Sequence, residues 1–558
     1  MTRENQPETT HSQVQAPRRM WVVLLYGWLA LLALQRLIYH HAYLHYDPFA
    51  HATFSDGQIY EEAARDILAL PPLGSKPFFL QGAYAYVVAA GLAPRGVLSD
   101  VLFLQLCLAA LACYCVYYAA RRVFDKFDAL LATAMFLAYV GLPFYENKYL
   151  SAQLGVTANA CVLACFAYLW HARSHTSALL LGFTSGLSVL ARANLVLALP
   201  FSMYALWQLA GGRGNQRQLQ LCAAAVLGLA LSLLPMATRN LLVTGSSSVL
   251  PSHAGGIPFY IGNHARSTGQ WNDAGGLITG QVSEERAELA ARLGLDPRAR
   301  NIDHSIGAAL YARAFNEIQR DPMRWITLEG RKLWLSLGNA ELTHDYDALG
   351  ERELLGDLRP LAIPFGVVLG FGAFGLYAAW RTRSQRLFAV MLTGQVFAVL
   401  AANLCWFTSA QNRLPLIVPL ALATAAFSRW LRRASQTRAV PQSWLLAAIG
   451  CMALGAQAYL ARPESKRPSS AHYYNLANVE ESLGLFEPAL KHYQRACERS
   501  PNQPMFWLRL AHLARSTQRH AQAHDALDHL AAIPRLPEPF AEAIRNERSA
   551  LMQASSQH

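Results

Sequence analysis

The sequence predicts an all-α fold: a polytopic bundle of about eleven membrane-spanning helices, followed by a soluble tail of helical repeats. Of the 558 residues, 53% are hydrophobic and only 15% are charged, which is too apolar for a soluble protein. Apolar stretches of about twenty residues, enough to cross a bilayer as a helix, recur along most of the chain. The polar C-terminal part instead repeats a pattern with a period of about 34 residues.

The predicted spans form a membrane domain at residues 20–460, after an N-terminal tail at 1–19. A linker at 461–470 then leads to a repeat domain at 471–552. No small-residue cleavage site of the secretory kind follows the first span, so we interpret that span as an uncleaved anchor. The spans run approximately over residues 20–39, 98–120, 128–143, 151–170, 177–191, 194–210, 218–237, 361–380, 386–404, 413–430 and 442–460.

The arginines indicate the orientation of the bundle. If the N-terminus is cytoplasmic, the basic connections at 121–126, 213–217, 381–386 and 429–438 all lie on the cytoplasmic side, as the positive-inside rule requires. The tail then lies outside, in the periplasm if this is a bacterial inner membrane. Counting apolar residues 77–92 as a span would reverse this pattern, so we expect an interfacial or re-entrant helix there. The net charge of +12 is spread between the spans, which excludes a nucleic-acid-binding face.

Two outer segments, at 40–97 and 239–360, are too long to be simple connections. Loops of this length are usually functional, and both concentrate ionisable and glycine residues. We therefore expect these two loops to be functional, and the alternative is that they only cap the bundle.

The tail carries the spacing of tetratricopeptide repeats. Because two repeats alone are seldom stable, residues 538–552 are expected to form a capping helix, unless the pair leans on the membrane domain. The aligned positions are Tyr473, Leu476, Ala477, Gly484, Ala489, Tyr493, Ala496 and Pro501 in the first repeat, and Trp507, Leu510, Ala511, Ala523, Leu527 and Leu530 in the second.

The first outer loop contains one carboxylate of particular interest. Asp56 stands just ahead of a predicted helix on which Tyr60, Ala63, Ala64 and Ile67 form one face. A carboxylate there can cap the helix by accepting its free amide hydrogens. It can equally act as a general base toward an acceptor hydroxyl at the membrane surface. The residues alone leave both roles open.

The order of motifs resembles the GT-C glycosyltransferases, in particular the branch that contains the aminoarabinose lipid A transferases and the protein O-mannosyltransferases. Two departures from that branch are Gln81-Gly82-Ala83-Tyr84 in place of a Pro-Leu-Tyr, and Gln411 where a second arginine often precedes Arg413. The matching motifs are Asp56-x-x-x-Tyr60-x-x-x-Ala64-Arg65, Lys76-Pro77-Phe78-Phe79, Leu190-Ala191-Arg192-Ala193-Asn194, the segment Ser252 to Asn263, Gly330-Arg331-Lys332-Leu333-Trp334, Asn339-Ala340-Glu341, and Asn412-Arg413-Leu414-Pro415.

The resemblance implies transfer of a hexose or pentose from a polyprenyl-phosphate carrier to an acceptor hydroxyl, with inversion at the anomeric carbon and Asp56 as the base. The leaving lipid phosphate needs cations, for which the candidates are Lys76, Arg331, Lys332 and Arg413. Each of these could also be an interfacial anchor. The other substrate-binding residues that the resemblance implies are Tyr60, Tyr84, Arg192, Gly255, Gly256, Asn263 and Glu341.

A metal site has only weak support in the sequence. His40, His41, His45 and His51 lie close to Asp47 and Asp56, but their spacing matches no established metal motif. We therefore assign no metal ligand and no certain cofactor, although a divalent metal stays open. Asp345 and Asp347 could contact sugar hydroxyls or belong to a solvated turn.

Two other functions compete with this hypothesis. A ligase for polyprenyl-linked glycans would need several arginines in one outer loop, and Arg286, Arg292, Arg298 and Arg300 fit that requirement. A non-enzymatic scaffold would use the bundle only to anchor the repeats for envelope assembly. In every case the repeats favour a protein partner, either the acceptor itself or a protein that presents a glycan acceptor.

Overall fold

The computed structural model describes residues 10–211, 215–252, 255–272, 289–299, 302–342, 346–437, 442–460, 468–534, 536 and 538–555. Within these ranges every regular element is a helix, apart from one isolated bridge between Tyr139 and Ile363. The predicted all-α class is therefore confirmed. The helices before residue 245 are α1 (Thr10–Tyr46), η1 (Pro48–Ala50), α2 (Asp56–Ala69), α3 (Gly82–Leu92), α4 (Leu98–Val123), α5 (Lys126–Ala138), α6 (Gly141–Glu146), α7 (Ala152–Ala172), α8 (His175–Ala191), η2 (Ala193–Ala198), α9 (Leu199–Ala210) and α10 (Asn215–Thr244).

The second half continues the helical pattern through the second outer loop, the last spans and the tail. Its helices are α11 (Gly256–Asn263), α13 (Ile302–Arg320), α14 (Pro322–Ser336), α15 (Ala348–Leu355), α16 (Phe365–Arg381), η3 (Arg383–Gln385), α17 (Arg386–Cys405), α18 (Ala410–Arg413), η4 (Leu414–Leu416), α19 (Ile417–Thr437), α20 (Gln442–Leu460), α21 (Ser470–Ser482), α22 (Phe486–Arg499), α23 (Pro504–Ser516), α24 (His520–Ala531) and α25 (Glu538–Ser555).

The described residues divide into two compact units. The membrane unit takes them from the ranges 1–40, 59–342 and 358–462, and the repeat unit from 41–58, 343–357 and 463–558. The predicted boundaries at 20–460 and 471–552 stay predictions, but the repeat unit gathers segments of both outer loops around the tail. Asp56, at the start of α2, belongs to the repeat unit.

Seven helices of the membrane unit are long and apolar enough to cross a membrane, which makes the chain an integral membrane protein. Three further predicted spans coincide with the shorter apolar helices α8, α16 and α20. The prediction of one continuous helix at 128–143 is wrong. The backbone becomes extended at Tyr139, and Ala138 and Val140 hydrogen-bond to Ile363, so this segment divides into α5 and α6.

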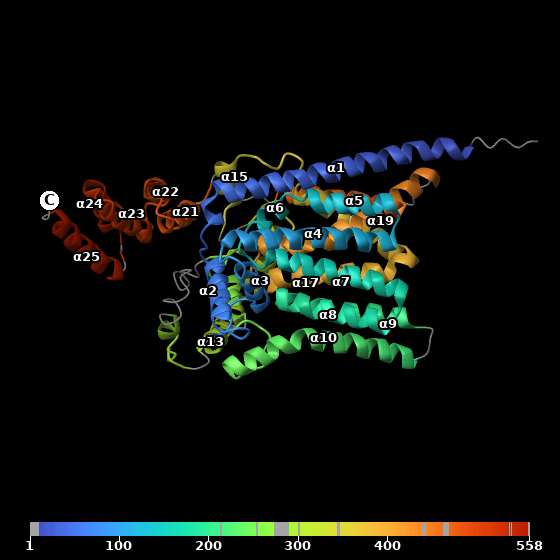
Figure 1. The fold of residues 1–558 in the computed structure, drawn as a ribbon, viewed down its shortest axis with the longest axis horizontal. Coiled ribbons are helices and arrows are strands. Elements are labelled where there is room, and N and C mark those ends of the chain that lie inside the picture. The colour runs from blue at the N-terminus through green and yellow to red at the C-terminus, as the bar shows by residue number, and fades with distance from the viewer. Residues whose placement is uncertain are drawn as a thin grey trace, which may run out of the picture. The chain divides into compact units, whose positions relative to one another are not determined.

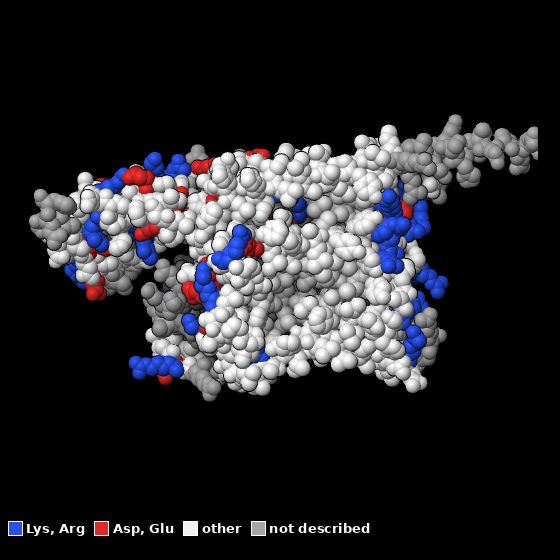
Figure 2. Space-filling model, viewed as in Figure 1, with Lys and Arg blue, Asp and Glu red and all other residues white. Residues whose placement is uncertain are grey.

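The spans pack side by side through small residues. Helices α4, α7, α8 and α10 form one row of neighbours (Figure 1). A Cβ added to Gly182 of α8 would lie 1.8 Å from the carbonyl oxygen of Ala225 in α10, so only glycine permits this close approach. Figure 2 shows an uncharged surface along the helices, with Lys and Arg gathered at the end where α9 ends and α10 begins.

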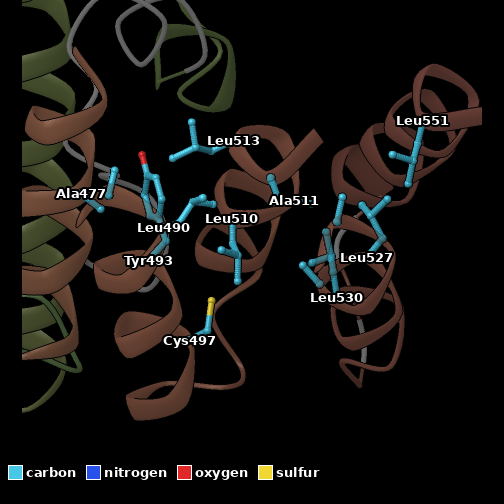
Figure 3. Close-up of a cluster of buried hydrophobic side chains, with 14 of the residues drawn as sticks. Ala477, Leu490, Tyr493, Cys497, Leu510, Ala511, Leu513, Leu527, Leu530 and Leu551 are labelled. Carbon is cyan, nitrogen blue, oxygen red and sulfur yellow. The ribbon is translucent and has the colours of Figure 1, made fainter. Parts of the chain in front are cut away.

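The tail has its own hydrophobic core. Side chains of α21, α22, α23 and α24 point toward one another (Figure 3), and Leu551 of α25 is fully buried among them. The expected capping helix at 538–552 is thus confirmed as α25, which closes the C-terminal end of the array. Ile544, also of α25, belongs to the same core cluster as Leu530 of α24.

Candidate active site

The loop that carries Lys76 is fixed from two sides. Asp66 of α2 accepts hydrogen bonds from the backbone nitrogens of Ser75 (2.7 Å) and Lys76 (3.1 Å). Desolvation raises the pKa of Asp66, but the bonds from Ser75 and Lys76 outweigh it, so the pKa lies below its usual value. From α10, Arg239 donates to the carbonyl oxygens of Leu73 (2.8 Å) and Lys76 (2.6 Å). The backbone of Lys76 is therefore held firmly.

The side chain of Lys76, unlike its backbone, is not held by hydrogen bonds from the described residues. It is exposed, and its ammonium makes no hydrogen bond or close ion pair within the described part of the chain, although its charge attracts Asp66 and helps to lower the pKa of that carboxyl. A cation on a fixed backbone with an uncommitted head group is well suited to bind an anion from solution or from a lipid headgroup.

Arg331 and Lys332, two consecutive cations of α14, differ sharply in exposure and in bonding. Arg331 is exposed, like Lys76, and has no ion pair among the described residues. Lys332 is fully buried, and its ammonium donates to Asn263 (3.0 Å), to Glu329 (2.6 Å) and to the carbonyl oxygen of Leu404 (2.7 Å). Burial lowers the pKa of Lys332, and Glu329 opposes this. With all three ammonium hydrogens engaged, Lys332 joins α14 to α11 and α17.

Arg413 is likewise committed to the protein. It is 2% exposed and donates to the carbonyl oxygens of Gly338 and Ala340. It also pairs with Glu341 over 3.2 Å, and its guanidinium carbon lies 4.4 Å from the ring centroid of Phe365. Arg413 therefore joins residues 338–341 of the second outer loop to α18 and to the start of α16.

Glu341 is bound through one oxygen only. Its Oε1 accepts from the hydroxyl of Tyr139 (2.8 Å) as well as from Arg413. Its Oε2 is buried and has no hydrogen-bond partner among the described residues. A buried carboxylate oxygen without a donor is costly, so this atom is a candidate acceptor for a substrate hydroxyl.

Arg192 lies in the turn between α8 and η2. Its guanidinium donates to the side chain of Asn412 (2.8 Å) and to the carbonyl oxygen of Gln411 (3.1 Å). Its stem crosses Gly155 of α7, where an added Cβ would come within 2.7 Å. Two motifs of the resemblance, at 190–194 and 412–415, therefore meet in space.

The two predicted tyrosines belong to a buried polar network. Tyr60 donates to Gln81, and its ring stands edge-on to that of Tyr84 at 4.6 Å. The hydroxyl of Tyr84 donates to Gln105 (3.2 Å), which in turn donates to the carbonyl oxygen of Lys148 (2.8 Å). Gln81, a departure from the related branch, is thus an integral part of this network.

The glycines and Asn263 have packing roles. Gly255 has a positive φ of 79°, which favours glycine. Gly256 approaches Gly307 of α13 so closely that a Cβ would lie 2.2 Å from its carbonyl oxygen. Asn263 accepts from Trp325 (3.1 Å) and from Lys332, and donates to the carbonyl oxygens of Phe259 and Cys405. These contacts pack α11 against α13, α14 and α17.

Asp56 begins α2 within the repeat unit. Its side chain is partly exposed, and the residue before it, Ser55, has a positive φ of 50°. Asp47, further back in the same loop, is 1% exposed and caps η1 by accepting from the nitrogen of Phe49 (3.0 Å). Of these two carboxylates, Asp56 is the accessible one.

The histidines do not assemble into a metal site in the described residues, where no group of three potential ligands occurs. His40 bonds to Asn147 over 2.6 Å, and His41 and His45 stack on each other. Asp347 caps α15 through the nitrogens of Leu349 and Gly350. Asp345, Arg286 and Arg300 lie outside the described residues.

Sequence reasoning missed two buried arginines in the spanning helices. Arg239 directly follows the predicted span at 218–237. An ionisable residue at the end of an apolar run is a signal that could have identified it. Arg36, inside the first helix, pairs with Glu146 of α6, and both side chains are buried. Burial raises the pKa of Glu146, against the effect of Arg36.

The family model described as tetratricopeptide repeat matches residues 471–513, which confirms the repeat prediction there. Comparison with curated protein sequences returned no match. Among solved structures, the chain is similar to the oligosaccharyltransferase AglB from Archaeoglobus fulgidus in complex with an inhibitory peptide and a dolichol-phosphate (17% identity, TM-score 0.40, 82% of this chain and 58% of that chain).

A second similar structure is ArnT from Cupriavidus metallidurans bound to undecaprenyl phosphate, with 16% identity and a TM-score of 0.31, over 75% of this chain and 81% of that chain. A third is the same archaeal oligosaccharyltransferase tethered with an acceptor peptide. It has 16% identity and a TM-score of 0.41, over 92% of this chain and 60% of that chain. The chain spans about three fifths of the length of the oligosaccharyltransferase chains it matches.

Proposed function

We propose that this protein is an integral-membrane glycosyltransferase that moves a sugar from a polyprenyl-phosphate carrier to an acceptor hydroxyl at the outer face. The observation that carries the proposal is the division among the candidate cations. Lys332 and Arg413 are buried and committed to protein acceptors, whereas Lys76 and Arg331 are exposed and uncommitted. Lys76 in addition has a fixed backbone.

Lys76 binds the phosphate of the donor in this proposal, with Arg331 as the second cation. A lipid phosphate is already a good leaving group, and the negative charge that it gains when the bond to the sugar breaks needs a cation rather than a strong acid. Lys332 and Arg413 hold the surrounding backbone in place. The division thus gives the four predicted cations two different tasks.

Asp56 is the general base. Its carboxylate takes the proton of the acceptor hydroxyl while the hydroxyl oxygen attacks the anomeric carbon. The bond from that carbon to the phosphate oxygen breaks, and the carrier phosphate leaves with the electron pair. Attack opposite to the leaving group inverts the anomeric carbon.

Glu341 contacts a hydroxyl of the transferred sugar through Oε2, which has no donor of its own among the described residues. Arg192, Tyr60 and Tyr84 support the site in this proposal through their bonds to Asn412, Gln81 and Gln105. Gly255, Gly256 and Asn263 keep α11 packed against α13 and α17.

The repeats take a protein, either the acceptor or one that presents it, because such arrays form surfaces suited to peptides and helices. The proposed setting is a bacterial inner membrane, with the N-terminus in the cytoplasm and the tail in the periplasm. The gathering of Lys and Arg at one end of the bundle supports this orientation (Figure 2).

Comparison of glycans from host cells with and without the protein tests the proposal. We expect one sugar to be missing from one class of acceptor in the deletion strain, and the carrier-linked form of that sugar to accumulate. Loss of a whole oligosaccharide would instead indicate a ligase. Unchanged glycans with defective envelope assembly would indicate a scaffold and contradict the proposal.

A further inference from the structure

The repeat unit is built from three separated segments. The tail is joined by residues 41–58 of the first outer loop and 343–357 of the second. The first of these segments ends in the turn that carries Asp56. The tail is therefore packed with the loop that holds the proposed base.

An aromatic cluster joins η1 to the tail. Phe49, which is 3% exposed, lies with its ring centroid 5.6 Å from Tyr346 and 6.2 Å from His472 of α21. Phe54, two residues before Asp56, lies 4.7 Å from both Phe49 and Tyr346. One residue from the tail and one from each outer loop thus meet at Phe49.

Hydrogen bonds make a second connection, between α15 and the tail. The carboxylate of Asp347 caps α15 with one oxygen and accepts from the nitrogen of Ser469 with the other (2.9 Å). Glu353 accepts from the hydroxyl of Tyr473 (2.7 Å) and lies 3.4 Å from Arg495. A pocket of about 270 Å³ is lined by residues of α15, α21 and α22 at this junction.

This arrangement explains how so short an array is completed. Two repeats need further elements to bury their end faces. Helix α25 covers one end of the described tail, and η1 and α15 pack on α21 at the other. The outer-loop segments therefore act as the N-terminal cap of the repeats.

The backbone next to Asp56 has a conformation that needs such support. Ser55 has a φ of 50°, which residues other than glycine rarely adopt and which persists only where the surroundings impose it. The preceding residue, Phe54, is held by Phe49 and Tyr346. These ring contacts therefore hold the residue that leads into the turn.

We infer that the repeat tail positions Asp56 for the reaction, with His472 as the positioning residue that acts through Phe49 and Tyr346. The inference rests on the proposed function, because Asp56 must be the base for its position to matter.

The test compares full-length His472→Ala with His512→Ala, a histidine of α23 whose side chain bonds to Glu547 inside the tail. Hydrogen exchange is followed at Gly57 and Gln58, whose nitrogens bond to Phe54 and Ser55. We expect His472→Ala to raise exchange there at least tenfold and to lower glycan transfer about tenfold, with unchanged affinity for undecaprenyl phosphate. His512→Ala should change none of these.

A second variant covers the case in which His472→Ala fails to fold. Gly350→Ala leaves the tail sequence intact but places a Cβ about 2.1 Å from the His472 ring, so it should displace that ring with the same result. Wild-type exchange at residues 57 and 58 in both variants would overturn the inference alone. Full transfer by Asp56→Asn would overturn the proposed function, and the inference with it.

Discussion

The guanidinium carbon of Arg239 lies 3.7 Å from the ring centroid of Phe78, and its Nη2 donates to the carbonyl oxygen of Lys76. This contact links the end of α10 to the loop that presents the proposed phosphate-binding lysine. Since Arg239 is 2% exposed and bonds to backbone carbonyls, it acts on the conformation of that loop.

Arg239→Ala should therefore release the Lys76 loop. Hydrogen bonds from charged donors contribute about 1.5–3 kcal/mol each, so we expect at least tenfold weaker binding of undecaprenyl phosphate. Arg217→Ala is the matched control, because Arg217 also donates to a backbone carbonyl, that of Arg173, at the basic end of the bundle. Equal affinities in the two variants would contradict the role of Arg239.

Lys76→Ala tests the phosphate contact itself. Loss of one charge-assisted bond of about 1.5–3 kcal/mol corresponds to roughly ten- to a hundredfold weaker carrier binding. Arg65→Ala is the control, because Arg65 is an exposed cation that pairs with Glu61 on α2. Calorimetry with undecaprenyl phosphate gives the comparison, and an unchanged affinity for Lys76→Ala would make that residue an interfacial anchor only.

Glu341→Gln should affect transfer, whereas Glu329→Gln should affect stability. The amide introduced by Glu341→Gln keeps an oxygen that can accept from Tyr139 and Arg413, so folding should persist while transfer falls about tenfold or more. Glu329→Gln removes the carboxylate partner of buried Lys332, which should lower the unfolding temperature by several degrees. Thermal unfolding and transfer rates of both variants test these two expectations. A wild-type transfer rate for Glu341→Gln would remove Glu341 from the proposed site.

The topology can be tested with paired reporter fusions. We expect fusions in the loops at 121–127, 211–217 and 429–440 to report the cytoplasm, and a fusion at residue 465 to report the outer side. A cytoplasmic signal at 465 would mean that an even number of helices cross the membrane. It would also contradict the interfacial assignment of residues 77–92.

Most of the fold could be predicted because span length and repeat spacing are local properties of the sequence. The break between α5 and α6 could not, since it depends on pairing of Ala138 and Val140 with the distant Ile363. The same holds for the N-terminal cap of the repeats, which consists of η1 and α15 from two different loops.

The sequence suggested which residue types form the candidate site, but it could not show which of their side chains are engaged by other protein groups. Nothing in the sequence distinguishes the uncommitted Arg331 from Lys332, because the acceptors of Lys332 come from Asn263 and Leu404, far away in the chain. Arg413 is fixed by carbonyl groups in the same way. Long-range backbone acceptors decide which cations stay available for a ligand.

Transfer by Asp56→Asn is the most direct test of the central claim. Asparagine caps a helix start about as well as aspartate, so the variant should fold and bind undecaprenyl phosphate normally. Loss of a general base typically lowers a rate on the order of a hundred- to ten-thousandfold. We therefore expect the glycan to be absent from cells that carry normal amounts of this variant. Wild-type glycosylation by Asp56→Asn would contradict the account and reduce Asp56 to a helix cap.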